Sequence, residues 1–307
     1  AWFVYQSVWK IRKTLSMIYP RHSIDHKNND NPQLERGREG TANMYVTLND
    51  EQIFIGTGHQ QFDPSKPSIV FIHGAGMSHL VWALYTRYYA HNGYNVLSVD
   101  LPGHGLSGGE LRGSIESMAD FVNSVIDHFA IEDCRLVGHS MGSLIAIETA
   151  HRRPERVKQL VLIGCAYPMT VGEPLLEAAR KDHPSAVDMM VIWGHDYAEQ
   201  IGGNRVSGVR AIIQAKRWLQ SAAPGVLFND LNACNEYQNA ETAIQQFDVP
   251  VAMIVGDRDK MTPPKVAAAT AKSLANVDFY PISKCGHGCM LEQPEKTHVA
   301  IANALRA

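Results

Sequence analysis

The sequence predicts an α/β fold in which a mostly parallel central sheet is flanked by helices, with a helical segment inserted before the penultimate strand. Strand-like and helix-like patterns alternate from Met44 onward, which is typical of parallel sheets covered on both faces. Residues 157–163 and 249–255, which are mostly apolar, are interpreted as strands that are buried on both faces. A chain of 307 residues, 45% of them hydrophobic, can fill a large core of this kind.

The predicted elements follow one another in a regular order. The leading hairpin comprises strands 44–48 and 52–57, which turn at Asn49 and Asp50. A strand at 68–72, a helix at 80–90, a strand at 95–99 and a helix at 116–130 come next. The second half is expected to contain a strand at 134–137, a helix at 143–151 that ends before Pro154, strands at 157–163 and 249–255, a last strand around Phe279, and a helix at 294–305.

This order divides the chain into three parts. Residues 41–164 and 249–307 are predicted to form the α/β core, and residues 1–40 to form an amphipathic segment with a linker. Residues 165–248 are far more than one crossover helix requires. They contain helical stretches at 175–181, 187–193 and 209–219 that are rich in Met, Trp and Ile, so a helical cap over the carboxyl ends of the strands is expected.

The first twenty residues resemble an interfacial or docking helix. Their apolar residues recur at helical spacing and their charges are all basic; the residues are Val4, Val8, Ile11, Leu15 and Ile18, with Lys10, Arg12 and Lys13. This pattern predicts weak association with a membrane surface or with a second copy of the chain through residues 1–20, and a trimmed leader is the alternative. A secretory signal is not predicted, because the positive charges lie inside the apolar stretch.

Composition narrows the function classes. A net charge of -3 and the lack of a basic run interleaved with aromatic residues argue against nucleic acid as a partner. The five cysteines are an odd number and widely scattered, which favours a reducing compartment and predicts a cytoplasmic protein. The glycine-rich loop 103–109 is interpreted as a structural turn rather than a phosphate-binding loop, because no G-x-x-x-x-G-K-[ST] motif accompanies it, and no cofactor is expected. Cys285, His287 and Cys289 lack an obvious fourth ligand, so no metal is expected either.

The stretch Gly138-His139-Ser140-Met141-Gly142 carries the strongest functional signal. A serine between two glycines, after a short apolar strand and before a helix, is the pattern of a nucleophile elbow. In such an elbow the serine occupies a strained strand-to-helix turn, and side chains two residues away on either side would collide with the neighbouring strand and helix. The alternative is an ordinary turn flanked by glycines.

A serine hydroxyl needs a base, and the base needs an orienting acid. Asp259 follows one buried strand and His287 follows the last strand, so parallel strands would bring both to the same sheet edge as Ser140. Asp257 is the alternative acid, or else a turn residue bonded to its own backbone. His73 is expected to hold the loop in which it lies rather than to titrate in catalysis.

Five motifs occur in a familiar order: residues 73–76 (HGAG), 100–107 (DLPGHGLS), 138–142 (GHSMG), 256–259 (GDRD) and 286–287 (GH). From about Met44 to its end, the chain resembles a cap-bearing serine hydrolase of the α/β-hydrolase superfamily, near the esterase and lipase branch. The resemblance implies an oxyanion hole formed by the backbone amides of Ala75 and Met141, with Gly76 as the alternative to Ala75. Residue 141 begins a helix, whose unpaired amides suit a developing negative charge.

The expected function is that of a serine carboxylic-ester hydrolase that acts through an acyl-enzyme on small to medium hydrophobic esters. Ser140 in the elbow argues against dehalogenases and epoxide hydrolases, which carry aspartate there. A carbon-carbon bond hydrolase is the alternative enzyme, although these usually have a tryptophan shortly after the histidine and this chain does not. A lactonase on the same fold is also compatible with these motifs, and so is a non-enzymatic module that binds a small molecule. Activity is expected to fall below about pH 6 to 7, where an ordinary histidine protonates.

Overall fold

The computed structural model describes residues 44–203, 208, 210–245 and 248–306. The predicted helix in residues 1–20 lies outside this range. Among the described helices, none is both long and apolar enough to cross a membrane.

The described residues form one sheet of eight strands in the order β1-β2-β4-β3-β5-β6-β7-β8. β1 and β2 form an antiparallel hairpin, β2 pairs antiparallel with β4, and the pairs from β4 to β8 are parallel. The predicted fold class is therefore confirmed. The strands are β1 (Met44–Leu48), β2 (Glu51–Gly56), β3 (Ser68–Ile72), β4 (Asn95–Val99), β5 (Cys134–His139), β6 (Val157–Ile163), β7 (Val251–Gly256) and β8 (Val277–Ile282).

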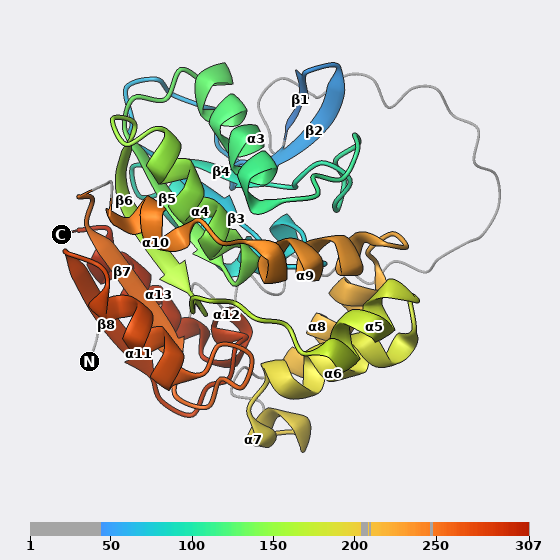
Figure 1. Cartoon of the computed structure of the whole chain (residues 1–307). Helices are drawn as coiled ribbons and strands as arrows, with labels where there is room; N and C mark the ends of the chain where they lie inside the picture. The colour runs from blue at the N-terminus through green and yellow to red at the C-terminus, as the bar shows by residue number, and fades with distance from the viewer. Residues whose placement is uncertain (1–43, 204–207, 209, 246–247, 307) are drawn as a thin grey trace. The chain divides into compact units, whose positions relative to one another are not determined.

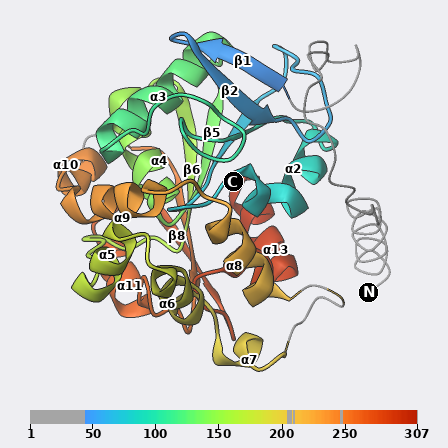
Figure 2. The same cartoon turned by 90° about the vertical axis from the view of Figure 1, so that its right-hand side faces the viewer.

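Helices cover both faces of the sheet (Figure 2). On one face α2 (Ala83–Ala90) and α13 (Pro294–Ala304) pack against one cluster of buried apolar residues. On the other face α3 (Ile115–His128), α4 (Met141–Arg152) and α11 (Pro264–Lys272) pack against a second, larger cluster. The strands β3, β4 and β7 are buried along their whole length, and most of their residues are apolar.

The segment between β6 and β7, named the insertion below, is helical throughout most of its length (Figure 1). It comprises α5 (Glu173–Arg180), α6 (Pro184–Gly194), α7 (Tyr197–Gln200), α8 (Ala211–Gln220), α9 (Val226–Glu236) and α10 (Ala240–Gln245). The three helical stretches expected from sequence correspond to α5, α6 and α8. The short α7 and the half-polar α9 and α10 have no extended run of apolar residues at helical spacing, so the sequence pattern did not indicate them.

The insertion is tied to the core beside α4. The hydroxyl of Tyr237, at the end of α9, donates to the buried carboxylate of Glu148 on α4 at 2.8 Å, and Asn239 Nδ2 donates to the same oxygen at 2.9 Å. Arg152 completes the partners of Glu148 with a bond from Nε at 2.8 Å. A buried carboxylate with three donors is well satisfied, so this cluster holds one end of the insertion in place.

Two local features differ from the sequence prediction. The expected helix 80–90 begins as a 3-10 turn, η1 (His79–Trp82), whose Leu80 amide donates to the Ser78 side chain, and α2 continues from it. A short helix, α12 (Cys289–Glu292), follows His287 and was not expected, since four residues are too few for a periodic pattern.

Candidate active site

Ser140 occupies the sharp turn between β5 and α4. Its φ of 54° and ψ of -119° place it in a strained region of backbone space. A Cβ on Gly138 would lie 2.2 Å from the carbonyl oxygen of Gly142, and a Cβ on Gly142 would lie 2.3 Å from the carbonyl oxygen of Ile72. Both contacts are to backbone atoms that cannot move aside, so the two glycines allow helix and strand to meet at this turn.

Asp259 and His287 meet at the same edge of the sheet as Ser140. His287 Nδ1 lies 2.7 Å from Asp259 Oδ2, and both side chains are buried. Asp259 also accepts hydrogen bonds from the Met261 and Thr262 amides at 2.8 Å and from the Thr262 hydroxyl at 2.6 Å. Burial opposes the ionised form of Asp259, but the His287 and Thr262 contacts outweigh it, and its pKa lies below the ordinary value.

The second nitrogen of His287 is free. Because Nδ1 faces a carboxylate, the ring carries its proton there, and the lone pair is on Nε2. His287 Nε2 is buried and has no hydrogen-bond partner among the described residues, Ser140 included. The ring is closely packed, since a Cβ on Gly164 would lie 2.8 Å from His287 Cε1. The imidazole is thus oriented by Asp259, with an unused acceptor.

Asp257 plays a different part from either one expected. Its side chain makes no hydrogen bond to His287 or to its own turn; its Oδ1 accepts the amide of Cys285 at 3.2 Å. The amide of Arg258 adds a bond to the Cys285 carbonyl at 2.9 Å. Asp257 therefore links the loop after β7 to the loop that carries His287.

The loop after β3 presents backbone amides near Ser140. Within the described residues, neither the Ala75 amide nor the Met141 amide has a hydrogen-bond acceptor. The Gly76 amide is already used, because it donates to Asp230 Oδ2 at 2.8 Å. His73 holds this loop: its Nδ1 lies 2.9 Å from the Gly74 carbonyl, and its Nε2 accepts the Leu101 amide at 3.2 Å.

Two further histidines surround His287. His139 Nε2 lies 3.1 Å from the His287 carbonyl and His195 Nδ1 lies 2.9 Å from the Val191 carbonyl, so each ring donates through that nitrogen. Burial lowers the pKa of His139 to about 3 and that of His195 to about 4. Both rings are therefore neutral near pH 7 and add no positive charge beside His287.

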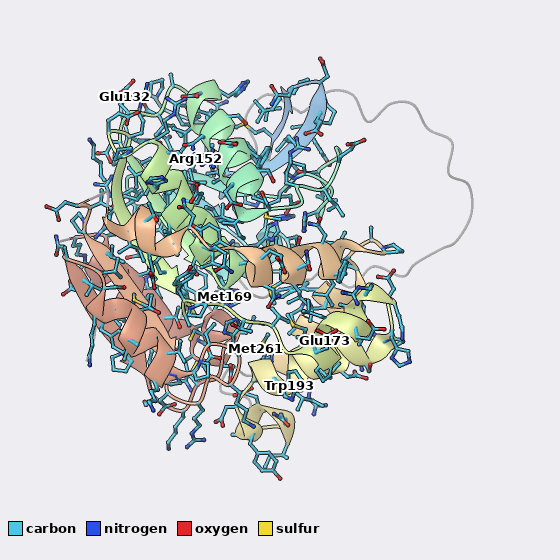
Figure 3. All side chains as sticks on the ribbon, in the orientation of Figure 1. Glu132, Arg152, Met169, Glu173, Trp193 and Met261 are labelled. Atoms are coloured by element: carbon cyan, nitrogen blue, oxygen red, sulfur yellow. The ribbon has the colours of Figure 1, made fainter. Side chains whose placement is uncertain are left out.

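An apolar pocket lies between these loops and the insertion. Its core side includes Met77, His139, Met261 and His287, and its other side consists of residues of α6 and α8, among them Trp218. Met261, labelled in Figure 3, lies close to the end of α6: a Cβ on Gly194 would be 3.5 Å from its sulfur. The arrangement offers apolar groups a place next to His287.

Sequence reasoning missed three residues that shape this site. Thr262 could have been found, because it lies three residues after Asp259 in a turn where a hydroxyl can reach back. Asp230 and Glu292 carried no signal, since each is a single acidic residue in a helix that the sequence pattern did not indicate.

The cysteines beside His287 are buried free thiols in the structure. Within the described ranges, no three His, Cys, Asp or Glu side chains are grouped so that they could hold a metal ion.

The alpha/beta hydrolase family profile matches residues 69–300, and the chain belongs to this family. It is 28% identical over 256 residues to a pimeloyl-[acyl-carrier protein] methyl ester esterase of Aromatoleum aromaticum, covering 79% of this chain and 99% of the relative. It is 25% identical over 273 residues to a 2-hydroxy-6-oxononadienedioate/2-hydroxy-6-oxononatrienedioate hydrolase of Paraburkholderia phymatum, covering 84% and 93%. The solved enol-lactonase of Burkholderia xenovorans has the same fold, with a TM-score of 0.75 at 18% identity, covering 86% and 100%.

Proposed function

We propose that this protein is a serine carboxylic-ester hydrolase that acts through an acyl-enzyme on small to medium hydrophobic esters. The observation that carries the proposal is the pairing of His287 Nδ1 with Asp259 at 2.7 Å, which leaves His287 Nε2 as a buried and unused base. Ser140 stands at a strained turn of the same sheet edge, where its hydroxyl is the nucleophile in this scheme.

In the proposed mechanism His287 Nε2 takes the proton of Ser140 as the serine oxygen attacks the ester carbonyl. Asp259 keeps the ring in the required tautomer and stabilises the imidazolium. The amides of Ala75 and Met141 are free to bind the oxyanion, and Met141 begins α4, whose helix dipole favours negative charge there. His287 then protonates the leaving alcohol and activates the water that releases the acid; no cofactor or metal takes part.

The apolar pocket and the insertion support a hydrophobic substrate. In this proposal the insertion acts as a cap over the loops that follow β3, β5, β7 and β8, and its helices α6 and α8 supply one side of the pocket. One relative is named a methyl ester esterase, which supports an ester as the substrate class.

The same machinery would serve a carbon-carbon bond hydrolase or a lactonase. The relative from Paraburkholderia phymatum favours the first, and it is 93% covered by the match. Here His287 is followed by Gly288 and Cys289 rather than by a tryptophan, so we rank the ester hydrolase first. All five cysteines are buried free thiols, which supports a reducing compartment such as the cytoplasm.

A fluorophosphonate probe tests the nucleophile. We expect the purified protein to be labelled once, and Ser140→Ala to be unlabelled and at least about 100-fold slower on p-nitrophenyl butyrate with an unchanged melting temperature. A wild-type protein that is neither labelled nor active would favour a binding module instead.

A substrate series then tests the class of bond. The series comprises p-nitrophenyl esters of increasing acyl length, an aryl ester, a γ-lactone and a vinylogous 1,5-diketone. The ester assignment requires kcat/KM to be highest for an ester with a short or medium acyl group. A preference for the lactone or the diketone would replace it with lactone hydrolysis or carbon-carbon bond hydrolysis, respectively.

A further inference from the structure

Asp230, on α9 of the insertion, reaches two loops of the core at once. Its side chain is fully buried, and its Oδ2 accepts the Gly76 amide at 2.8 Å and faces His104 Nε2 at 2.8 Å. The other oxygen accepts Asn229 Nδ2 at 3.2 Å. Gly76 follows β3 and His104 follows β4, so one carboxylate joins the insertion to both loops.

The contacts of His104 define its charge. Nε2 faces the Asp230 carboxylate, and Nδ1 lies 3.0 Å from the Pro102 carbonyl. Both partners can only accept, so both ring nitrogens carry protons and the ring is an imidazolium. Burial alone would lower the pKa of His104, but the attraction and hydrogen bond of Asp230 raise it above the ordinary value. His73, whose ring centroid lies 5.0 Å away, is neutral, because burial lowers its pKa to about 4.

The carboxylate also defines the orientation of one peptide group. The amide of Gly76 belongs to the same peptide plane as the carbonyl of Ala75. If this plane turned over, the Ala75 carbonyl would face the Asp230 carboxylate, and two oxygens that can only accept would meet in a buried place. The φ of Gly76 is +66°, so this conformation costs little for glycine and would be strained for other residues.

We propose that Asp230 is a positioning residue: it holds the peptide between Ala75 and Gly76, which shares the Ala75 Cα with the preceding peptide, and so keeps the Ala75 amide of that preceding peptide directed at the oxyanion. This inference rests on the proposed ester hydrolysis. In this arrangement the insertion supplies part of the catalytic geometry as well as a wall of the pocket. His104 acts through Asp230, since its imidazolium pairs with the buried carboxylate at 2.8 Å and holds it in place.

The test compares Asp230→Leu with Asp230→Asn on p-nitrophenyl butyrate. Leucine removes the acceptor for the Gly76 amide, whereas the asparagine oxygen keeps it. We expect kcat to fall about 10- to 100-fold in Asp230→Leu with KM within about threefold, and to stay within about fivefold of wild type in Asp230→Asn. The double variant His104→Leu/Asp230→Leu buries no unpaired charge, and the same loss is expected in it if the single leucine variant does not fold.

A trifluoromethyl ketone separates positioning from folding. The Ser140 oxygen adds to the ketone carbon, its proton passes to His287, and the hemiketal oxyanion lies at the amides of Ala75 and Met141. The inhibition constant should rise about 10- to 100-fold in Asp230→Leu. The matched control is Tyr237→Phe, which also removes a buried bond between the insertion and the core, at 2.8 Å, but away from this loop. It should lower the melting temperature and leave kcat and inhibition unchanged.

Each outcome decides between the proposals. A wild-type protein without Ser140-dependent activity contradicts the proposed function itself. With an active wild type, Asp230 is not a positioning residue if a folded leucine variant keeps kcat and inhibition within about threefold of wild type, or if leucine and asparagine reduce kcat equally.

Discussion

Glu292 makes the stability of this protein depend on pH near neutrality. The side chain is 1% exposed, and its carboxylate accepts the Asp196 amide at 2.8 Å and the Gly286 amide at 3.1 Å. Burial is the main reason why the pKa of Glu292 is raised from 4.5 to about 7, and the nearby carboxyl groups of Glu199 and Asp196 add to it, while the two amide bonds act in the opposite direction.

The shift sets the sign and size of the effect. Because the folded pKa lies above the unfolded one, Glu292 contributes stability that is complete below about pH 4.5 and is lost as the pH rises through about 7. The difference between these pKa values corresponds to about 3 kcal/mol of unfolding free energy. Glu292→Gln keeps an acceptor for the amides and stays neutral at every pH. The unfolding free energy of the variant should therefore lack this pH-dependent contribution.

Urea unfolding of wild type and Glu292→Gln from pH 5 to pH 9 measures the component. The stability of the variant relative to wild type should increase by about 2.5 kcal/mol between the two ends of this range, because part of the contribution is already lost at pH 5. The control Glu295→Gln changes an exposed carboxylate three residues away and should follow the wild-type profile. Profiles of wild type and Glu292→Gln that stay parallel within about 1 kcal/mol would refute the assignment of a raised pKa.

Two further predictions concern the loops around the site. Thr262→Val removes the 2.6 Å hydroxyl bond to Asp259 and should lower kcat about tenfold, whereas Thr262→Ser should retain most of it; equal losses in steady-state assays would argue against the bond. Gly142→Ala places a Cβ 2.3 Å from the Ile72 carbonyl oxygen and should destabilise the protein by about 3 kcal/mol or prevent folding. The control is Gly113→Ala, where the nearest atom to the added Cβ lies 4.0 Å away, and its unfolding free energy should stay within about 0.5 kcal/mol of wild type in thermal unfolding. A Gly142→Ala protein as stable as wild type would show that the turn can relax to accept a Cβ.

The parts that sequence predicted well are those controlled by short stretches of chain. The strands β3 and β6 have the predicted bounds, and all their residues except Lys158 are buried, as in the inner strands of a parallel sheet. The two elbow glycines are required for the reason that the sequence predicted: a Cβ at either position would clash with backbone atoms within or beside the same turn. Parallel pairing brings the loops after β7 and β8 together, and there Asp259 meets His287.

The parts that sequence did not predict depend on contacts across long separations. The Gly76 amide could bond Asp230 or face the substrate, and nothing near residue 76 decides between these; the packing of α9 against the core does. Asp257 could have bonded its own turn, but the fold brings the Cys285 amide within 3.2 Å.

The sequence by itself determined the order of chemical groups along the chain and the turns that carry them, because glycine spacing, apolar runs and helix starts act over a few residues. Only the tertiary structure decided which amides near Ser140 remain free, which histidines stay neutral and which carboxylates are paired. These properties depend on burial and on partners 28 to 154 residues away, as for Asp259 with His287 and for Asp230 with Gly76. Hydrogen bonding and desolvation act through space, so they are settled only when the insertion and the core are packed together.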